Sequence, residues 1–199
     1  IYDELGQVHL RKGEIEEAEI FIEKALDIAE KTRDEDMTAR VNNTLGNIYL
    51  KKGIWEDAEN CFRKCMGGLD GKDESMSTIA LNNLAIIKYR TGKTEKAIEY
   101  WEEAAQKAEK MKSLNVMLTF ANLGFMHFTI GDWEKAKEYT EKNLEISEQI
   151  KKDTYSSAAM TVLADIDLHR GNEEKAIEKY EKALQMRKAL GDKSCQGAS

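Results

Sequence analysis

Apolar positions in this chain recur with the three-to-four-residue spacing of amphipathic helices, and polar stretches separate the runs. Residues at this spacing lie on one face of a helix, so each run predicts a helix that buries one side. The helices are predicted in pairs, named A and B in chain order. The A helices are expected near 1–12, 37–52, 75–91, 115–130 and 154–170. The B helices are expected near 15–32, 55–66, 94–112, 133–150 and 173–190.

One unit of sequence repeats five times along the chain. Its glycines stand 40, 39, 39 and 40 residues apart, at Gly13, Gly53, Gly92, Gly131 and Gly171. A leucine precedes each glycine by eight residues, at Leu5, Leu45, Leu84, Leu123 and Leu163. An alanine follows each glycine by five residues, at Ala18, Ala58, Ala97, Ala136 and Ala176. Such a period is typical of a repeat protein, in which each unit stacks on the next.

Each repeated position has a physical reason. Glycine adopts the left-handed backbone conformation that ends a helix without a Cβ clash, so it predicts the end of helix A. Acidic residues such as Glu16 and Glu56 then favour the start of helix B, where the helix dipole is positive. Small residues let the paired helices approach closely, and large neighbours such as Phe62 and Trp101 fill the remaining space.

The order leucine, small residue, glycine, alanine, aromatic and alanine resembles the tetratricopeptide repeat over nearly the whole chain. The period of 39 to 40 residues and the absence of proline resemble the long-helix subclass found in Pins/LGN scaffolds and kinesin light chains. Repeat four departs most, with Thr140 and Asn143 where an aromatic and a small residue are expected. The resemblance implies an all-α fold, a right-handed superhelical solenoid of five helix-turn-helix repeats.

The repeats are expected to form one domain over 1–199, because the connections between them are too short to be domain linkers. Their approximate bounds are 1–34, 35–73, 74–112, 113–152 and 153–191. By repeat phase, residues 192–199 are expected to start a sixth helix A, which implies an array excised from a longer protein. Solenoids need polar caps at their ends, so exposed apolar surface is expected at a terminus.

Composition and charge exclude several classes of function. Hydrophobic residues make up 41% and charged residues 34% of the chain, as in a soluble helical protein. A net charge of -7 disfavours nucleic acid as a partner. No apolar run approaches the ~20 residues of a membrane span, and no secretory signal opens the chain, so no membrane partner is expected. Three cysteines are too few for a disulfide framework, which favours a cytoplasmic location.

Repeat phase also selects the residues of the A helices that would line the concave face of the stack. The asparagines among them offer both a donor and an acceptor to the main chain of an extended peptide. The apolar members would pack partner side chains, and the basic members would meet an acidic partner. The candidates are Arg40, Asn43, Asn47, Lys51, Asn82, Asn83, Ile86, Tyr89, Arg90, Leu118, Asn122, Phe125 and Phe128.

Each group of candidates also has an alternative explanation. The asparagines could bond neighbouring helices or water, and the apolar residues could belong to the core between repeats. The basic residues Arg11, Lys51 and Arg90 stand just before the turns, where a cation favours the negative end of the helix dipole. A clamp for a C-terminal carboxylate is not expected, because only its asparagine part is present.

No catalytic residue, metal site or cofactor is expected, so the chain is not expected to be an enzyme. Cys61 and Cys65 stand one helical turn apart without further ligands at metal-binding spacing, which favours a structural role. His9 and His127 occupy one repeat position and are expected to pack between helices. No phosphate loop, nucleotide fingerprint or catalytic triad pattern is present.

The sequence therefore predicts a protein-interaction scaffold that binds a peptide or a segment of a partner protein along repeats two to four. One alternative is a regulatory or sensor segment of a larger signalling enzyme or transcription regulator. Another is a module that self-associates through uncapped array ends. The identity of the partner and its direction in the groove are not encoded in any motif.

Overall fold

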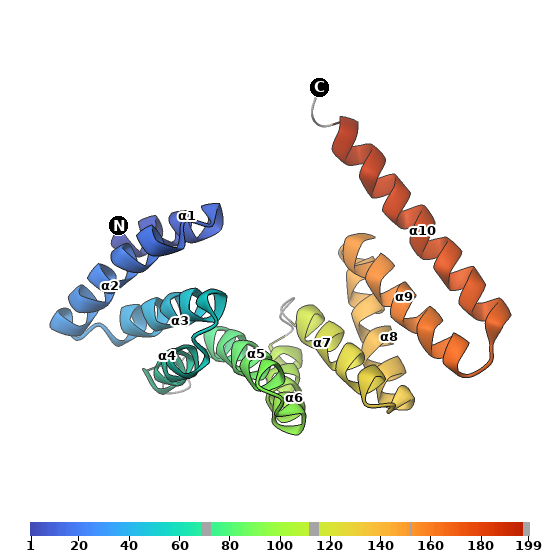
Figure 1. Cartoon of the computed structure of the whole chain (residues 1–199), viewed down its shortest axis with the longest axis horizontal. Coiled ribbons are helices and arrows are strands. Elements are labelled where there is room, and N and C mark those ends of the chain that lie inside the picture. The colour runs from blue at the N-terminus through green and yellow to red at the C-terminus, as the bar shows by residue number, and fades with distance from the viewer. Residues whose placement is uncertain (69–72, 112–115, 152, 197–199) are drawn as a thin grey trace. The chain divides into compact units, whose positions relative to one another are not determined.

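The computed structural model describes residues 1–68, 73–111, 116–151 and 153–196, without the side chains of 153 and 192–196. The described residues form helices and turns only, which confirms the all-α fold. Figure 1 shows the helices in chain order. The A helices are α1 (Tyr2–Lys12), α3 (Glu35–Lys52), α5 (Glu74–Arg90), α7 (Val116–Thr129) and α9 (Asp153–His169). The B helices are α2 (Ile15–Thr32), α4 (Trp55–Gly68), α6 (Thr94–Lys110), α8 (Trp133–Gln149) and α10 (Glu173–Gln196).

The five repeat glycines lie where the sequence predicts the end of each A helix. All five have positive φ, between 75° and 84°. At the end of α3, the N–H of Gly53 bonds the carbonyl of Leu50 at 3.2 Å, and the N–H of Ile54 bonds the carbonyl of Tyr49 at 2.9 Å. These bonds satisfy carbonyls that the helix leaves open, so the glycine closes helix A before helix B begins.

The helix bounds lie within two residues of the prediction, except the end of α10. Asp34 and Asp73 cap α3 and α5, and accept hydrogen bonds from the N–H groups of Met37 and Met76 at 2.9 Å. These caps start the helices at Glu35 and Glu74, slightly before the apolar pattern begins. Helix α10 continues to Gln196, so 192–196 extend the fifth B helix where a sixth A helix is expected. Residues 197–199 lie outside the described part of the chain.

The chain divides into two compact units, 1–113 and 114–199, each of which is described by itself. In unit 1, helices α1 to α6 pack in chain order, and the A helices α1, α3 and α5 also touch one another in turn. In unit 2, helices α7 to α10 pack in chain order, and α7 touches α9. Each unit therefore has a face made of neighbouring A helices.

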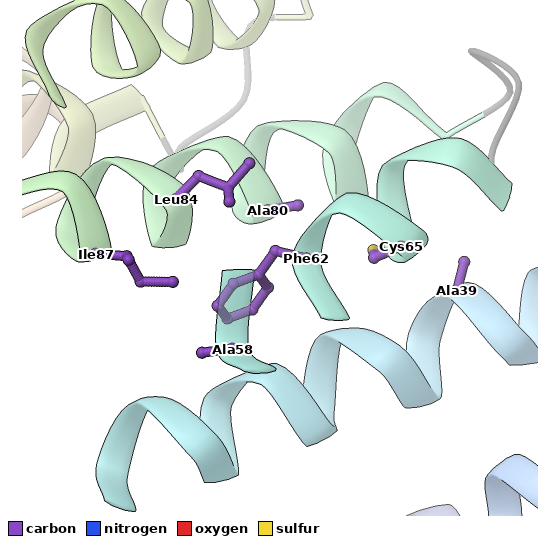
Figure 2. Close-up of a cluster of buried hydrophobic side chains, with 7 residues drawn as sticks. All are labelled: Ala39, Ala58, Phe62, Cys65, Ala80, Leu84 and Ile87. Carbon is purple, nitrogen blue, oxygen red and sulfur yellow. The ribbon is translucent and has the colours of Figure 1, made fainter. Parts of the chain in front are cut away.

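Unit 1 is held together by apolar clusters that join each repeat to the next. Figure 2 shows one cluster, in which Phe62 of α4 lies among alanines and larger side chains of neighbouring helices. Its members are Ala39, Ala58, Phe62, Cys65, Ala80, Leu84 and Ile87. A second cluster contains Ala18, Ile22, Ala25, Val41, Leu45, Ile48 and Cys61. Helix B of one repeat thus packs on helix A of the next, as the repeat pattern predicts.

In the three repeats where the residue after the leucine is a glycine, that glycine lies against helix B. A Cβ added to Gly46 of α3 would lie 2.7 Å from Cε1 of Phe62 of α4. At the same repeat position, a Cβ on Gly124 of α7 would lie 2.4 Å from Oγ1 of Thr140. The glycines let helix A contact helix B directly, whether the opposing residue is the usual aromatic or the threonine of repeat four.

Apolar side chains are exposed on α1, at the N-terminal end of unit 1. Leu5 and Val8 of α1 are 39% and 40% exposed. The residues at the same positions of the next repeat, Leu45 and Ile48, are 6% and 0% exposed. Self-association through this surface stays a prediction.

Ion pairs also join helix B of one repeat to helix A of the next. Lys52 Nζ of α3 lies 2.6 Å from Glu19 Oε2 of α2, and Lys88 Nζ of α5 lies 2.6 Å from Glu59 Oε2 of α4. Arg63 also bonds Glu59, at 2.8 Å. Burial favours protonated Glu59, but the hydrogen bonds from Lys88 and Arg63 together outweigh it and hold the pKa of this carboxyl below its ordinary value.

Glu59→Gln is expected to lower the free energy of unfolding of unit 1 by about 1 kcal/mol at neutral pH. Since the pKa of Glu59 is depressed in the folded state, the carboxylate stabilises the fold above the unfolded pKa of about 4.3. That contribution is lost as the pH falls through the folded pKa. Urea denaturation at a series of pH values should therefore show that the difference in unfolding free energy between wild type and variant shrinks in acid.

The control is Glu99→Gln, which removes an exposed pair with Lys96 on α6 and should change the free energy of unfolding little at any pH. A Glu59→Gln difference that does not depend on pH would contradict this assignment.

Candidate functional site

The predicted face residues lie on A helices of both units. Unit 1 carries them on α3 and α5, and unit 2 carries them on α7. The unit 1 A-face consists of the predicted residues on α3 and α5 and the residues at equivalent repeat positions on α1. Its members are Gln7, Leu10, Arg11, Arg40, Asn43, Asn47, Lys51, Asn83, Ile86, Tyr89 and Arg90. The unit 2 A-face consists of the predicted residues on α7, which are Leu118, Asn122, Phe125 and Phe128. The continuous groove predicted along repeats two to four would join the two units and stays a prediction.

Two asparagines of the unit 1 A-face form a direct link between neighbouring A helices. Nδ2 of Asn83 on α5 donates to Oδ1 of Asn47 on α3 at 3.1 Å. Both side chains are half-buried. The other polar groups of the two amides are Nδ2 of Asn47 and Oδ1 of Asn83. Neither forms a hydrogen bond with another protein atom that the structure describes. The pair therefore presents one donor and one acceptor from adjacent helices.

A shallow pocket lies on the same face between α1 and α3. It is lined by Gln7, Leu10, Arg11, Asn43, Thr44 and Asn47. Oδ1 of Asn43 is enclosed and accepts no hydrogen bond from the protein groups that the structure describes. A buried acceptor without a donor costs about 1–3 kcal/mol, so this enclosed amide oxygen lowers the stability of the fold.

Gln7 and Leu10 of this pocket were absent from the predicted set. They stand two and five residues after Leu5, as Asn47 and Leu50 stand after Leu45. Counting two and five residues from Leu5 therefore identifies Gln7 and Leu10 as face positions of the first repeat.

Asn82 was predicted to line the face, and the structure shows that this is wrong. The residue is 7% exposed, and its Nδ2 donates to the carbonyl of Thr78 at 3.1 Å. An asparagine that bonds the carbonyl of the preceding turn directs its amide along its own helix and away from a partner. Asn43 stands at the same repeat position but is half-buried, so repeat phase alone does not separate the two.

The charged members of the unit 1 A-face are accessible. Arg40, Lys51 and Arg90 are all exposed. Ile86 is half-buried, and Tyr89 is 38% exposed and has its ring centroid 6.5 Å from that of Trp101. The face thus combines amides, cations and a limited apolar surface.

The unit 2 A-face is more apolar. Leu118 and Phe125 are 49% and 47% exposed, and Asn122 is half-buried. Phe128 packs against the cluster of Ala136, Leu163 and Ile166 and meets His169 edge-on, with ring centroids 5.5 Å apart. Phe128 is therefore partly buried in the core of unit 2, whereas Leu118 and Phe125 are exposed enough to contact a partner.

Sequence profiles described as tetratricopeptide repeat match residues 1–69, 79–111 and 113–189. The matches follow the helix pairs described above and cover most of the chain. This chain belongs to the tetratricopeptide repeat family.

Solved structures of low sequence identity share the tetratricopeptide repeat fold. BtubC (BKLC) from P. vanneervenii has a TM-score of 0.85 at 23% identity, over 94% of this chain and 78% of that one. A putative kinesin light chain from Podosopora anserina, with nearly identical TPR-like repeats, has a TM-score of 0.76 at 18% identity, over 96% and 95%. A Rap protein complexed with Competence and Sporulation Factor has a TM-score of 0.74 at 15% identity, over 96% and 64%. No curated protein matches the sequence.

The tetratricopeptide repeat is generally a non-catalytic protein-interaction module. Cys61 and Cys65 are buried, and burial raises the pKa of both thiols to about 11, so both are protonated at neutral pH. His9 stacks on Phe21 with ring centroids 5.1 Å apart, and His127 stacks on Tyr139 at 5.5 Å, which confirms their predicted packing.

Among the described residues no group of histidine, cysteine and acidic side chains is arranged to hold a metal ion. In the same part of the chain no helix is long and apolar enough to cross a membrane.

Proposed function

We propose that this chain is a protein-interaction scaffold whose unit 1 A-face binds an extended segment of a partner protein. The observation that carries the proposal is the Asn47–Asn83 pair, which bridges α3 and α5 and keeps one donor and one acceptor for a ligand. An amide can bond a peptide main chain whatever its side chains are, because each peptide unit has a matching N–H and C=O. The pocket between α1 and α3, which Gln7, Arg11 and Asn47 line, adds polar side chains beside this pair.

Apolar residues of the unit 1 A-face are proposed to add affinity, and the unit 2 A-face is proposed as a separate apolar surface for a partner. Tyr89 on unit 1 and Leu118 and Phe125 on unit 2 are large and accessible, as residues that anchor partners usually are. The Rap structure of similar fold supports the proposal, since it is a complex with Competence and Sporulation Factor.

The test uses peptides selected from a random library on the wild-type chain. We expect Asn47→Ala/Asn83→Ala to weaken a selected peptide about tenfold or more, since two hydrogen bonds to its main chain are lost at about 0.5–1.5 kcal/mol each. The matched control is Asn60→Ala, which removes an exposed asparagine from the B helix α4 and should leave the dissociation constant unchanged. Equal affinity of all three proteins would refute the proposed face.

Phe125 is the apolar position to test with the asparagines. Phe128→Ala would disturb the core cluster around Leu163 as well as any binding. Phe125→Ala truncates a half-exposed ring and is expected to leave the thermal unfolding of unit 2 nearly unchanged. Loss of peptide binding with unchanged unfolding would then report on the surface alone.

A further inference from the structure

Three cations occupy one repeat position on the unit 1 A-face. Each stands two residues before the glycine that ends its helix: Arg11 on α1, Lys51 on α3 and Arg90 on α5. All three are exposed. Among the carboxylates that the structure describes, none forms an ion pair with these side chains, and Arg11 Nε bonds the carbonyl of Gln7 at 3.3 Å.

Other cations in the last turns of α3 and α5 are paired with the preceding B helix. Lys52 bonds Glu19 on α2, and Lys88 bonds Glu59 on α4, both at 2.6 Å. The last turns of α3 and α5 therefore each carry one cation that is paired with the preceding B helix, and one that has no acid partner within the described chain. These unpaired cations, together with Arg11, form a column across α1, α3 and α5, because these helices touch one another in turn.

The acidic residues of these helices lie at the opposite ends. The first turns hold Asp3, Glu4, Glu35, Asp36 and Glu74. Although the chain has a net charge of -7, the last turns of α1, α3 and α5 carry basic and no acidic residues, and the acids that follow, such as Glu16, Glu56 and Glu95, belong to the B helices. An anionic ligand is therefore expected to lie along the C-terminal ends of these A helices.

The spacing of the column limits the kind of ligand. Axes of packed helices lie about 8–10 Å apart, so cations at one position on successive helices repeat at about that distance. A chain in the polyproline II conformation rises about 3.1 Å per residue with three residues per turn. Every third side chain of such a segment lies on one side, about 9 Å from the last. This repeat is close to the spacing that a general helix-packing distance gives for cations on successive A helices.

We propose that the partner segment is acidic, with Asp or Glu at every third position, and crosses α1, α3 and α5 so that successive carboxylates meet Arg11, Lys51 and Arg90. The inference rests on the proposed function and narrows its partner to one class of sequence. A protein segment is favoured over a nucleic acid strand because the asparagines beside the column match a peptide main chain and the protein as a whole is acidic.

The test measures fluorescence anisotropy of labelled peptides with the whole chain. Three alanine–serine peptides carry equal numbers of glutamates, placed at every third position, at every second position, or consecutively. We expect the every-third peptide to bind about tenfold tighter than the other two, since it alone places each carboxylate opposite a cation. The triple variant Arg11→Gln/Lys51→Gln/Arg90→Gln should remove this preference and weaken the every-third peptide about tenfold.

The control for net charge is Lys24→Gln/Lys64→Gln/Lys110→Gln, which removes three exposed cations from the B helices α2, α4 and α6. It should retain the preference for the every-third peptide. Thermal unfolding of both triple variants shows whether the helices stay intact, because a cation in the last turn also favours its own helix.

Three results would overturn the inference: equal binding of the three glutamate peptides, no detectable binding of any of them, or tighter binding of single-stranded DNA in competition. A fourth peptide, with glutamine in place of every glutamate, separates this failure from that of the proposed function. If it binds as well as the acidic peptide and still depends on Asn47 and Asn83, the acidic preference is refuted and the peptide-binding face remains. If library-selected peptides do not depend on Asn47 and Asn83, the proposed function itself fails.

Discussion

Phe62→Ala is expected to lower the free energy of unfolding of unit 1 by about 3–5 kcal/mol, which is the largest effect we predict for a single change. The ring is 0% exposed and lies in the cluster that joins α3, α4 and α5 (Figure 2). Its neighbours Ala58 and Ala80 are too small to fill the space that alanine would leave. The cost therefore includes a cavity as well as the lost burial of the ring.

Urea denaturation of unit 1 measures this effect, because Trp55 packs against the same cluster and its fluorescence reports on the loss of that packing. Phe125→Ala is the matched control, since it truncates the same side chain at a position that is 47% exposed on unit 2. It should change the free energy of unfolding by less than about 0.5 kcal/mol. Similar losses for both variants would contradict the view that Phe62 joins the repeats.

Gly46→Ala is expected to destabilise unit 1 by up to about 2 kcal/mol, although alanine is the better helix former by about 1 kcal/mol. The added Cβ would lie 2.7 Å from the ring of Phe62, so α3 and α4 would have to separate or the ring would have to move. Overpacking of this kind costs about 1–3 kcal/mol and outweighs the gain in propensity.

Gly67→Ala supplies the opposite control within α4. A Cβ on Gly67 meets no atom of the described residues within 4 Å, so helix propensity is the effect expected there, and the variant should gain up to about 1 kcal/mol. Combining Gly46→Ala with Phe62→Leu should cost less than the sum of the two single changes, because the smaller side chain makes room for the Cβ. A stabilising Gly46→Ala would show that the two helices separate without cost.

Local signals explain why the helices and turns could be predicted. The period of 39 to 40 residues, the apolar spacing and the glycines each act over a few residues of chain. Positive φ at all five glycines follows from a preference that needs no tertiary contact. The helix starts at Glu35 and Glu74 also have a local cause, the caps Asp34 and Asp73, although apolar spacing alone placed them too late.

The candidate site could be predicted only in part. Repeat phase brought Asn47 and Asn83 onto one face, but their hydrogen bond depends on the distance between α3 and α5. Asn43 and Asn82 share a repeat position, yet Asn82 is buried and bonds its own helix. Phe125 and Phe128 stand on one helix, and only packing against Leu163 and Ile166 distinguishes Phe128 as partly core.

Spacing along one chain was enough to establish the family, the helix pairs, the turns and the shared repeat position of Arg11, Lys51 and Arg90. Contacts between helices determine whether these cations form a column, which asparagines remain accessible, which aromatic rings belong to the core and how the helices group into two units. The physical reason is that burial and side-chain hydrogen bonds depend on how closely neighbouring helices approach. That distance is set by pairs such as Gly46 and Phe62, which lie on different helices.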